Sequence, residues 1–92
     1  MAIEYVIGVY REKNSILQSD FWKLVNIYSD GGCFGFSNSQ FNTESKEYID
    51  LFIKTNKTLN LEDIQKEFEF SSISIISLKE LPDERQLAFN FN

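Results

Sequence analysis

Apolar residues alternate with polar ones in several short stretches, which predicts strands. From Ile3 to Arg11 one face is apolar and the other is mixed, as in a strand with one buried side. Cys33 to Ser37 repeats this alternation over five residues. Phe70 to Lys79 is rich in isoleucine, and its alternation changes phase at Ile75–Ile76. That change predicts either burial on both faces or a bulge at this point.

The C-terminal stretch has the pattern of a closing strand. A turn signal, Leu81-Pro82-Asp83-Glu84, precedes it, and three apolar residues then alternate with small or polar ones: Leu87, Phe89 and Phe91. No charge follows Arg85, so this strand would make a poor free edge. It is therefore expected either to lie inside the sheet or to pair with another chain.

Ser19 to Asp30 fits two interpretations. As a helix, Ser19 is the N-cap, four apolar residues share one face (Phe21, Leu24, Val25 and Tyr28), and Gly31 ends it. As a strand, Val25 and Ile27 point one way and Asp30-Gly31 begins a hairpin. Polar residues recur every third position within the segment, which favours the helix.

Two further segments are predicted to be helical. Asn42 or Thr43 begins the first, which runs to about Thr55 with a buried stripe of Tyr48, Leu51 and Phe52. Glutamates in its first turn and a lysine in its last complement the helix dipole. Asn60 caps a second, shorter helix, which buries Leu61, Ile64 and Phe68.

These elements predict an α+β fold with a mostly antiparallel sheet of about four strands and two to three α-helices packed on it. No repeat, low-complexity tract or Pro/Gly/Ser linker interrupts the sequence, which predicts a single domain over residues 1–92. The first residues lack the pattern of a signal peptide, and no apolar run is long enough to span a membrane. We therefore expect a cytoplasmic protein with no membrane partner.

Composition narrows the chemistry. The chain has no histidine and one cysteine, so Ser-His-Asp, Cys-His and zinc arrangements cannot be built. Gly31-Gly32-Cys33-Phe34-Gly35 is the one segment typical of an active-site loop, but no base is at hand to activate the Cys33 thiol. A glycine turn followed by a packed cysteine explains it more simply. The sequence predicts no enzyme activity, no cofactor and no metal ion.

Charge indicates the kind of partner. Fourteen acidic residues against nine basic ones give a net charge of −5, which disfavours direct binding of nucleic acid. The densest acidic cluster is Glu62, Asp63, Glu67 and Glu69, and Asp30 and Asp50 are weaker additions. Such a cluster is either a solvated helix face or a patch that docks on a basic protein surface.

The sequence thus predicts a small acidic binding protein that blocks the basic groove of a nucleic-acid-handling protein. Phage-encoded antagonists of bacterial defence and immunity proteins share this profile as a class. The alternative is a structural module that forms a homodimer, or extends another sheet, through Leu87, Phe89 and Phe91.

Overall fold

Two interleaved β-α-β units build the fold. The computed structural model describes residues 3–13, 19–31 and 33–82. In chain order, these hold β1 (Ile3–Glu12), α1 (Ser19–Tyr28), β2 (Cys33–Ser37), the 3₁₀ helix η1 (Ser39–Phe41), β3 (Lys46–Thr55), α2 (Leu61–Glu67) and β4 (Ile73–Glu80). The strands form one sheet in the order β2-β3-β1-β4, and every neighbouring pair is antiparallel. This βαββαβ connectivity is the ferredoxin-like arrangement. The predicted α+β class and antiparallel sheet are confirmed.

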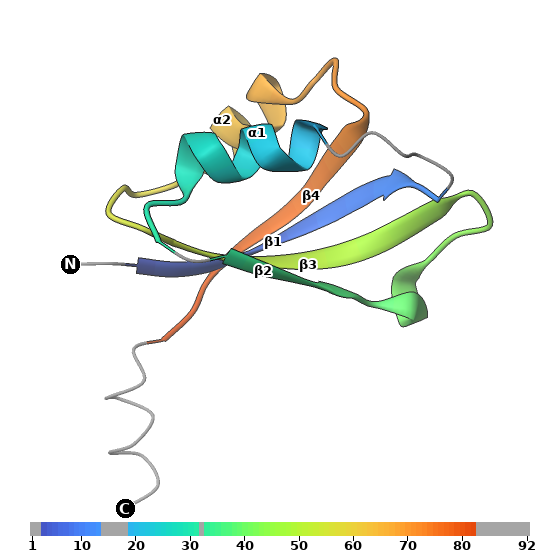
Figure 1. Ribbon diagram of the computed structural model, residues 1–92, viewed down its shortest axis with the longest axis horizontal. Helices are drawn as coiled ribbons and strands as arrows, with labels where there is room; N and C mark the ends of the chain where they lie inside the picture. Colours follow the sequence, from blue (N-terminus) through green and yellow to red (C-terminus); the bar gives the residue numbers. More distant parts are fainter. Residues whose placement is uncertain (1–2, 14–18, 32, 83–92) are drawn as a thin grey trace, which may run out of the picture.

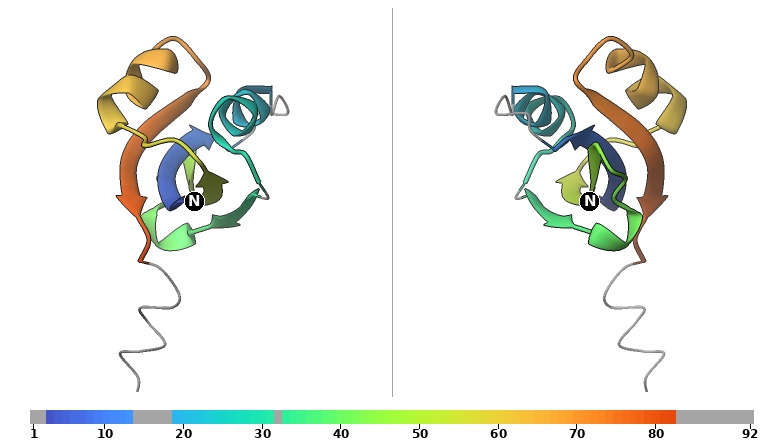
Figure 2. Two further views of the ribbon diagram at one scale, coloured as in Figure 1. Left: turned by 90° about the vertical axis from the view of Figure 1, so that its left-hand side faces the viewer. Right: turned by 90° about the vertical axis from the view of Figure 1, so that its right-hand side faces the viewer.

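Both α-helices cover the same side of the sheet (Figure 1, Figure 2). The odd-numbered residues of β1, β2 and β3 point to this side, which we call the helix face, and the even-numbered ones point to the opposite side, the open face. Neither α-helix lies on the open face, where η1 contributes Phe41 beside Tyr48 and Tyr10. The sheet therefore has one surface for the core and one for contact with the surroundings.

The core lies between the helix face and the two helices. Six apolar side chains in it have an exposed fraction of 2% or less: Ile7, Val9, Leu24, Ile53, Ile64 and Phe68. Leu24 comes from α1 and Ile64 from α2, so each helix inserts one fully buried side chain above the two central strands. Burial of each such side chain stabilises the fold by roughly 1.5–3 kcal/mol.

The two helices form where the apolar spacing predicted them, although Ser19, predicted as an N-cap, is the first helical residue of α1. Ser19–Tyr28 is a helix, and the strand alternative for this segment is wrong. The backbone N–H of Asp30 then donates to the carbonyl of Lys54 at 2.8 Å, which ties the end of α1 to β3. Asn60 caps α2 as predicted, because its side-chain oxygen accepts a hydrogen bond from the backbone N–H of Asp63.

The helix predicted from Asn42 or Thr43 to about Thr55 is wrong, because Lys46–Thr55 is strand β3. The spacing that suggested a helical stripe also fits alternation, with Leu51 on one face and Tyr48 and Phe52 on the other. Aromatic and β-branched residues favour a strand, and β3 pairs on both sides, with β1 and β2. Asn42 does not begin an α-helix: it is the C-cap of η1, and its side-chain oxygen accepts from the backbone N–H of Tyr48 at 2.8 Å.

The phase change in the fourth strand is a bulge. Gly8 pairs with Ser77 and Val9 pairs with Ile75, so Ile76 is the extra residue between them. This confirms the bulge predicted near Ile75–Ile76. The predicted closing strand with Leu87, Phe89 and Phe91 lies outside the described residues.

Candidate functional site

Aromatic rings gather on the open face. Three of them remain strongly exposed, with exposed fractions of 56% for Phe34, 58% for Phe36 and 50% for Phe41. The open-face ring cluster comprises six side chains from β1, β2, η1 and β3: Tyr10, Phe34, Phe36, Phe41, Tyr48 and Phe52. The ring contacts form two groups on this face, Phe34–Phe36–Phe52 and Tyr10–Tyr48–Phe41. Exposed aromatic groups of this kind on one face mark an interaction site in a folded protein.

The rings hold one another in place. Phe34 stacks on Phe52 with centroids 4.8 Å apart, and Phe36 meets both rings edge-on at 5.3 and 5.7 Å. Tyr48 contacts Tyr10 at 5.1 Å and Phe41 at 5.3 Å. Each such pair contributes about 0.5–1.5 kcal/mol beyond its buried area. The surface is thus pre-formed, which lowers the entropy lost when a partner binds.

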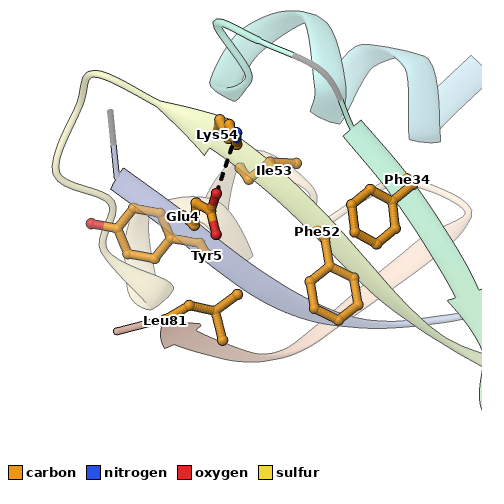
Figure 3. A pocket seen from close by; sticks show the side chains of 7 residues that line it. All are labelled: Glu4, Tyr5, Phe34, Phe52, Ile53, Lys54 and Leu81. Carbon is orange, nitrogen blue, oxygen red and sulfur yellow. Dashed lines mark ion pairs between the residues drawn. The ribbon is translucent and has the colours of Figure 1, made fainter. Parts of the chain in front are cut away.

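The open face is balanced in charge. Figure 3 shows one end of it, where the Glu4–Lys54 ion pair, 3.4 Å long, lies beside the stacked Phe34 and Phe52. By register, the acidic residues are Glu4, Glu12 and Asp50, and the basic ones are Lys46, Lys54 and Lys79. The acidic character of the chain therefore lies elsewhere.

The acidic cluster predicted from the sequence lies on the helix layer. Glu62, Asp63 and Glu67 are exposed residues of α2, and Glu69 is exposed in the turn after it. Lys23 of α1 approaches Glu67 to 3.9 Å, and both side chains remain about half exposed. The structure thus brings these four carboxylates onto one helix and its C-terminal turn, on the opposite side of the sheet from the ring cluster.

Two aromatic residues lie close to these acids. Burial raises the pKa of Tyr28, and the nearby Glu67 and Asp63 carboxylates raise it further. Phe70 directly follows Glu69 and is 96% exposed, the largest exposure of any bulky apolar side chain in the described residues. The acidic end of the molecule therefore also offers an apolar contact point.

The structure does not group Asp30 or Asp50 with the α2 acids. One Asp30 oxygen accepts from the backbone N–H of Asn56 at 2.9 Å and from the Thr55 hydroxyl at 3.3 Å, so this residue supports a loop. Asp50 lies on the open face, where it accepts from the Asn38 amide at 3.4 Å. The residues predicted to pair with another chain lie outside the described ranges: Leu87, Phe89 and Phe91.

Cys33 is half-buried on the helix face of β2, opposite Ile53 of β3. Within residues 3–13, 19–31 and 33–82, no hydrogen bond or ion pair reaches its thiol. In the same part of the chain, no three acidic or cysteine side chains converge to hold a metal ion. None of its helices is long and apolar enough to cross a membrane.

Three carboxylates make the stability of the fold dependent on pH. Hydrogen bonds from the Ser72 hydroxyl and N–H lower the pKa of Asp20, the Asn56 N–H lowers that of Asp30, and the Ser37 hydroxyl lowers that of Glu47. A carboxyl pKa that is lower in the folded state stabilises the fold above the unfolded pKa of about 4. This stabilisation is lost as the pH falls through the folded value.

We therefore expect the urea midpoint to stay level from pH 7 to about 5 and to fall steadily below about pH 4. The change D20N should flatten part of this decline, because it removes the Asp20 carboxyl that accepts from Ser72. Urea unfolding at a series of pH values, followed by circular dichroism, measures both. A midpoint that rises on acidification would contradict this assignment.

In comparisons with known proteins, no family model, curated protein or solved structure matches this chain. The sequence prediction missed the open-face ring cluster. It placed Tyr48 and Phe52 on a helix over residues 43–55, and so did not bring them next to Phe34 and Phe36. The signal was present in the alternation of Ile49, Leu51 and Ile53 with larger or polar neighbours.

Proposed function

We propose that this chain is a non-enzymatic binding protein that docks a protein partner on the open face of its sheet. The observation that carries the proposal is the ring cluster, in which Phe34, Phe36 and Phe41 are at least half exposed although other rings hold them in position. Rigid aromatic side chains at the centre of a surface are the residues that dominate binding energy at protein interfaces.

The charge pattern favours a near-neutral, apolar partner surface. On the described strands, acidic and basic side chains are equal in number on the open face, so these residues select neither a cationic nor an anionic partner. Aromatic sheets that stack nucleic-acid bases combine their rings with a positive groove for the phosphates. This chain has a net charge of −5, and the charges on the described part of its open face cancel, so that part of the face offers no positive groove for phosphates.

A second candidate uses the acidic end. Glu62, Asp63, Glu67 and Glu69 would occupy the basic groove of a nucleic-acid-handling protein, as an inhibitor of the phage-antagonist or immunity type would. The exposure of Phe70 beside Glu69 favours this candidate, because an apolar anchor next to carboxylates would add affinity to electrostatic steering. The two surfaces lie on opposite sides of the sheet, so separate variants can test them.

The test begins with capture of partners from the native host on the immobilised full chain, and each purified species is then titrated by calorimetry. If the ring cluster binds the partner, F36S should weaken affinity by about thirtyfold or more, the size of a hot-spot loss. The charge variant E62K should change it less than about threefold, and raising the salt should have little effect.

The reverse pattern, with a steep salt dependence and a loss in E62K but not in F36S, would overturn the open-face proposal in favour of the acidic candidate. Sedimentation of the purified chain supplies the control for self-association. A dimer abolished by F36S would show that a second copy occupies the face. Turnover of a substrate, abolished by one substitution, would overturn the non-enzymatic assignment.

A further inference from the structure

A cleft of about 350 Å³ lies on the helix face, between α1 and strand β2. Its volume is within the range of small-molecule sites, about 300–1,000 Å³. Its polar lining includes Arg11 of β1 and Ser37 of β2. Its apolar walls come from α1 and β3: Phe21, Trp22, Val25, Ile49 and Leu51. Most of the ring cluster lies on the other side of the sheet, although Phe34 of that cluster also lines the cleft. The role of the cleft does not depend on the function proposed for the open face.

The sequence of β2 keeps this cleft open. The three β2 residues on the helix face are small, namely Cys33, Gly35 and Ser37, whereas both phenylalanines of the strand point to the open face. A Cβ atom on Gly35 would lie 3.3 Å from Ile49 Cγ2, so even a methyl group there would reach the floor of the cleft. On the other wall, α1 buries Leu24 completely but leaves Trp22 61% exposed.

One end of the cleft is polar. Glu47 accepts from Arg11 Nε at 3.1 Å through one oxygen and from the Ser37 hydroxyl at 2.8 Å through the other. These bonds fix the guanidinium, whose Cζ also lies over the Phe21 ring, 5.8 Å from the ring centroid. Among the described residues the terminal amino groups of Arg11 donate to no side chain or carbonyl.

The charge at this end is positive. Lys13 is close enough to Glu47 to lower its pKa, after the larger effects of Ser37 and Arg11. Two cations, Arg11 and Lys13, therefore face one carboxylate that is already engaged. The Arg11 terminal amino groups, which have no partner among residues 3–13, 19–31 and 33–82, suit a carboxylate, because a guanidinium can bind one through two parallel hydrogen bonds.

We propose that the cleft binds a small amphipathic carboxylate, with its apolar chain along β2 and its carboxylate on Arg11. The distance from Cys33 to Ser37 spans four residue steps, ~13 Å at ~3.3 Å per residue. This length suits a medium-chain fatty acid lying extended along the strand. Burial of the chain against Val25, Ile49 and Leu51 supplies the affinity, and Arg11 sets the orientation and the preference for an anion.

The experiment uses the full chain with decanoate as the probe and decanol as its neutral counterpart. Trp22 is the only tryptophan, so its fluorescence reports occupancy of the cleft, and the methyl groups of Ile49 and Leu51 report it by NMR. We expect saturable shifts at these three residues, with decanoate binding about tenfold or more tightly than decanol. Equal affinity of the two probes would overturn the anion assignment.

Substitutions test the carboxylate contact with Arg11 and the burial of the apolar chain separately. R11Q should weaken decanoate about tenfold and leave decanol unchanged. G35V should weaken both probes, because the added side chain fills the floor. If G35V does not fold, V25F narrows the cleft from α1 and should have the same effect. F36L, on the other face of the same strand, is the matched control and should change neither affinity.

Decanoate shifts confined to the open-face rings, or no saturable shift at Trp22, would overturn the site itself. Neither result tests docking at the ring cluster. That proposal is tested by the affinity of a protein partner for the F36S variant.

Discussion

Replacing Ile7 with alanine is expected to lower the free energy of unfolding by about 2–5 kcal/mol. Ile7 has no exposed surface and lies in β1, a central strand, where it pairs with Leu51 on one side and Leu78 on the other. Truncation leaves a cavity beneath both helices that the paired strands cannot close. For a domain whose whole stability is about 5–15 kcal/mol, this loss is large.

Urea unfolding followed by circular dichroism measures the effect of I7A, and V6A is the matched control. Val6 is the adjacent residue on the same strand, but it points to the open face and is only half-buried. Its truncation should cost about 1 kcal/mol. Equal losses for the two variants would show that the core does not lie on the helix face.

Replacing Gly8 with valine is expected to cost about 3 kcal/mol and to disturb the open face as well. A Cβ atom at Gly8 would lie 2.5 Å from the Ser77 hydroxyl and would also clash with the hydroxyl of Tyr48. The Tyr48 ring crosses the strand at this point because glycine leaves room for it. It cannot move aside without leaving its contacts with Tyr10 and Phe41.

A double-mutant cycle tests this explanation of G8V. In a Y48A background the main obstacle is absent, so the added cost of G8V should fall by at least ~1 kcal/mol, within the usual coupling of residues in contact. The near-ultraviolet circular dichroism of the tyrosines should change in G8V alone. Strictly additive energies would show that Tyr48 does not limit the size of residue 8.

The sequence predicted the elements whose signals were local. β1, β2, α1 and α2 each carry their own alternation or spacing, and Asn60 supplies a cap for α2. Residues 46–55 were mistaken for a helix because Tyr48, Leu51 and Phe52 satisfy both periods. Their state is decided by two partner strands that lie far away in the sequence, which a local window does not contain.

The same limit applies to the site. The acids of α2 could be grouped from the sequence because a helix places residues three and four positions apart on one face. The ring cluster depends instead on the register of three strands. Phe34 meets Phe52 only because β2 pairs with β3 at that position. Asp30 was selected for its charge, but the structure shows it accepting backbone and hydroxyl hydrogen bonds in a loop.

The strand order has a consequence for how the chain reaches its native state during synthesis. β1 is made first, yet its two neighbours are β3 and β4, which end at Thr55 and Glu80. At a synthesis rate of about 5–20 residues per second, β1 waits roughly 2–9 s before β3 is complete, and longer for β4. During that interval the apolar strand Tyr5–Val9 has no neighbour from its own sheet. Nascent chains of this protein should therefore depend on ribosome-bound chaperones, and folding should be slow for their length.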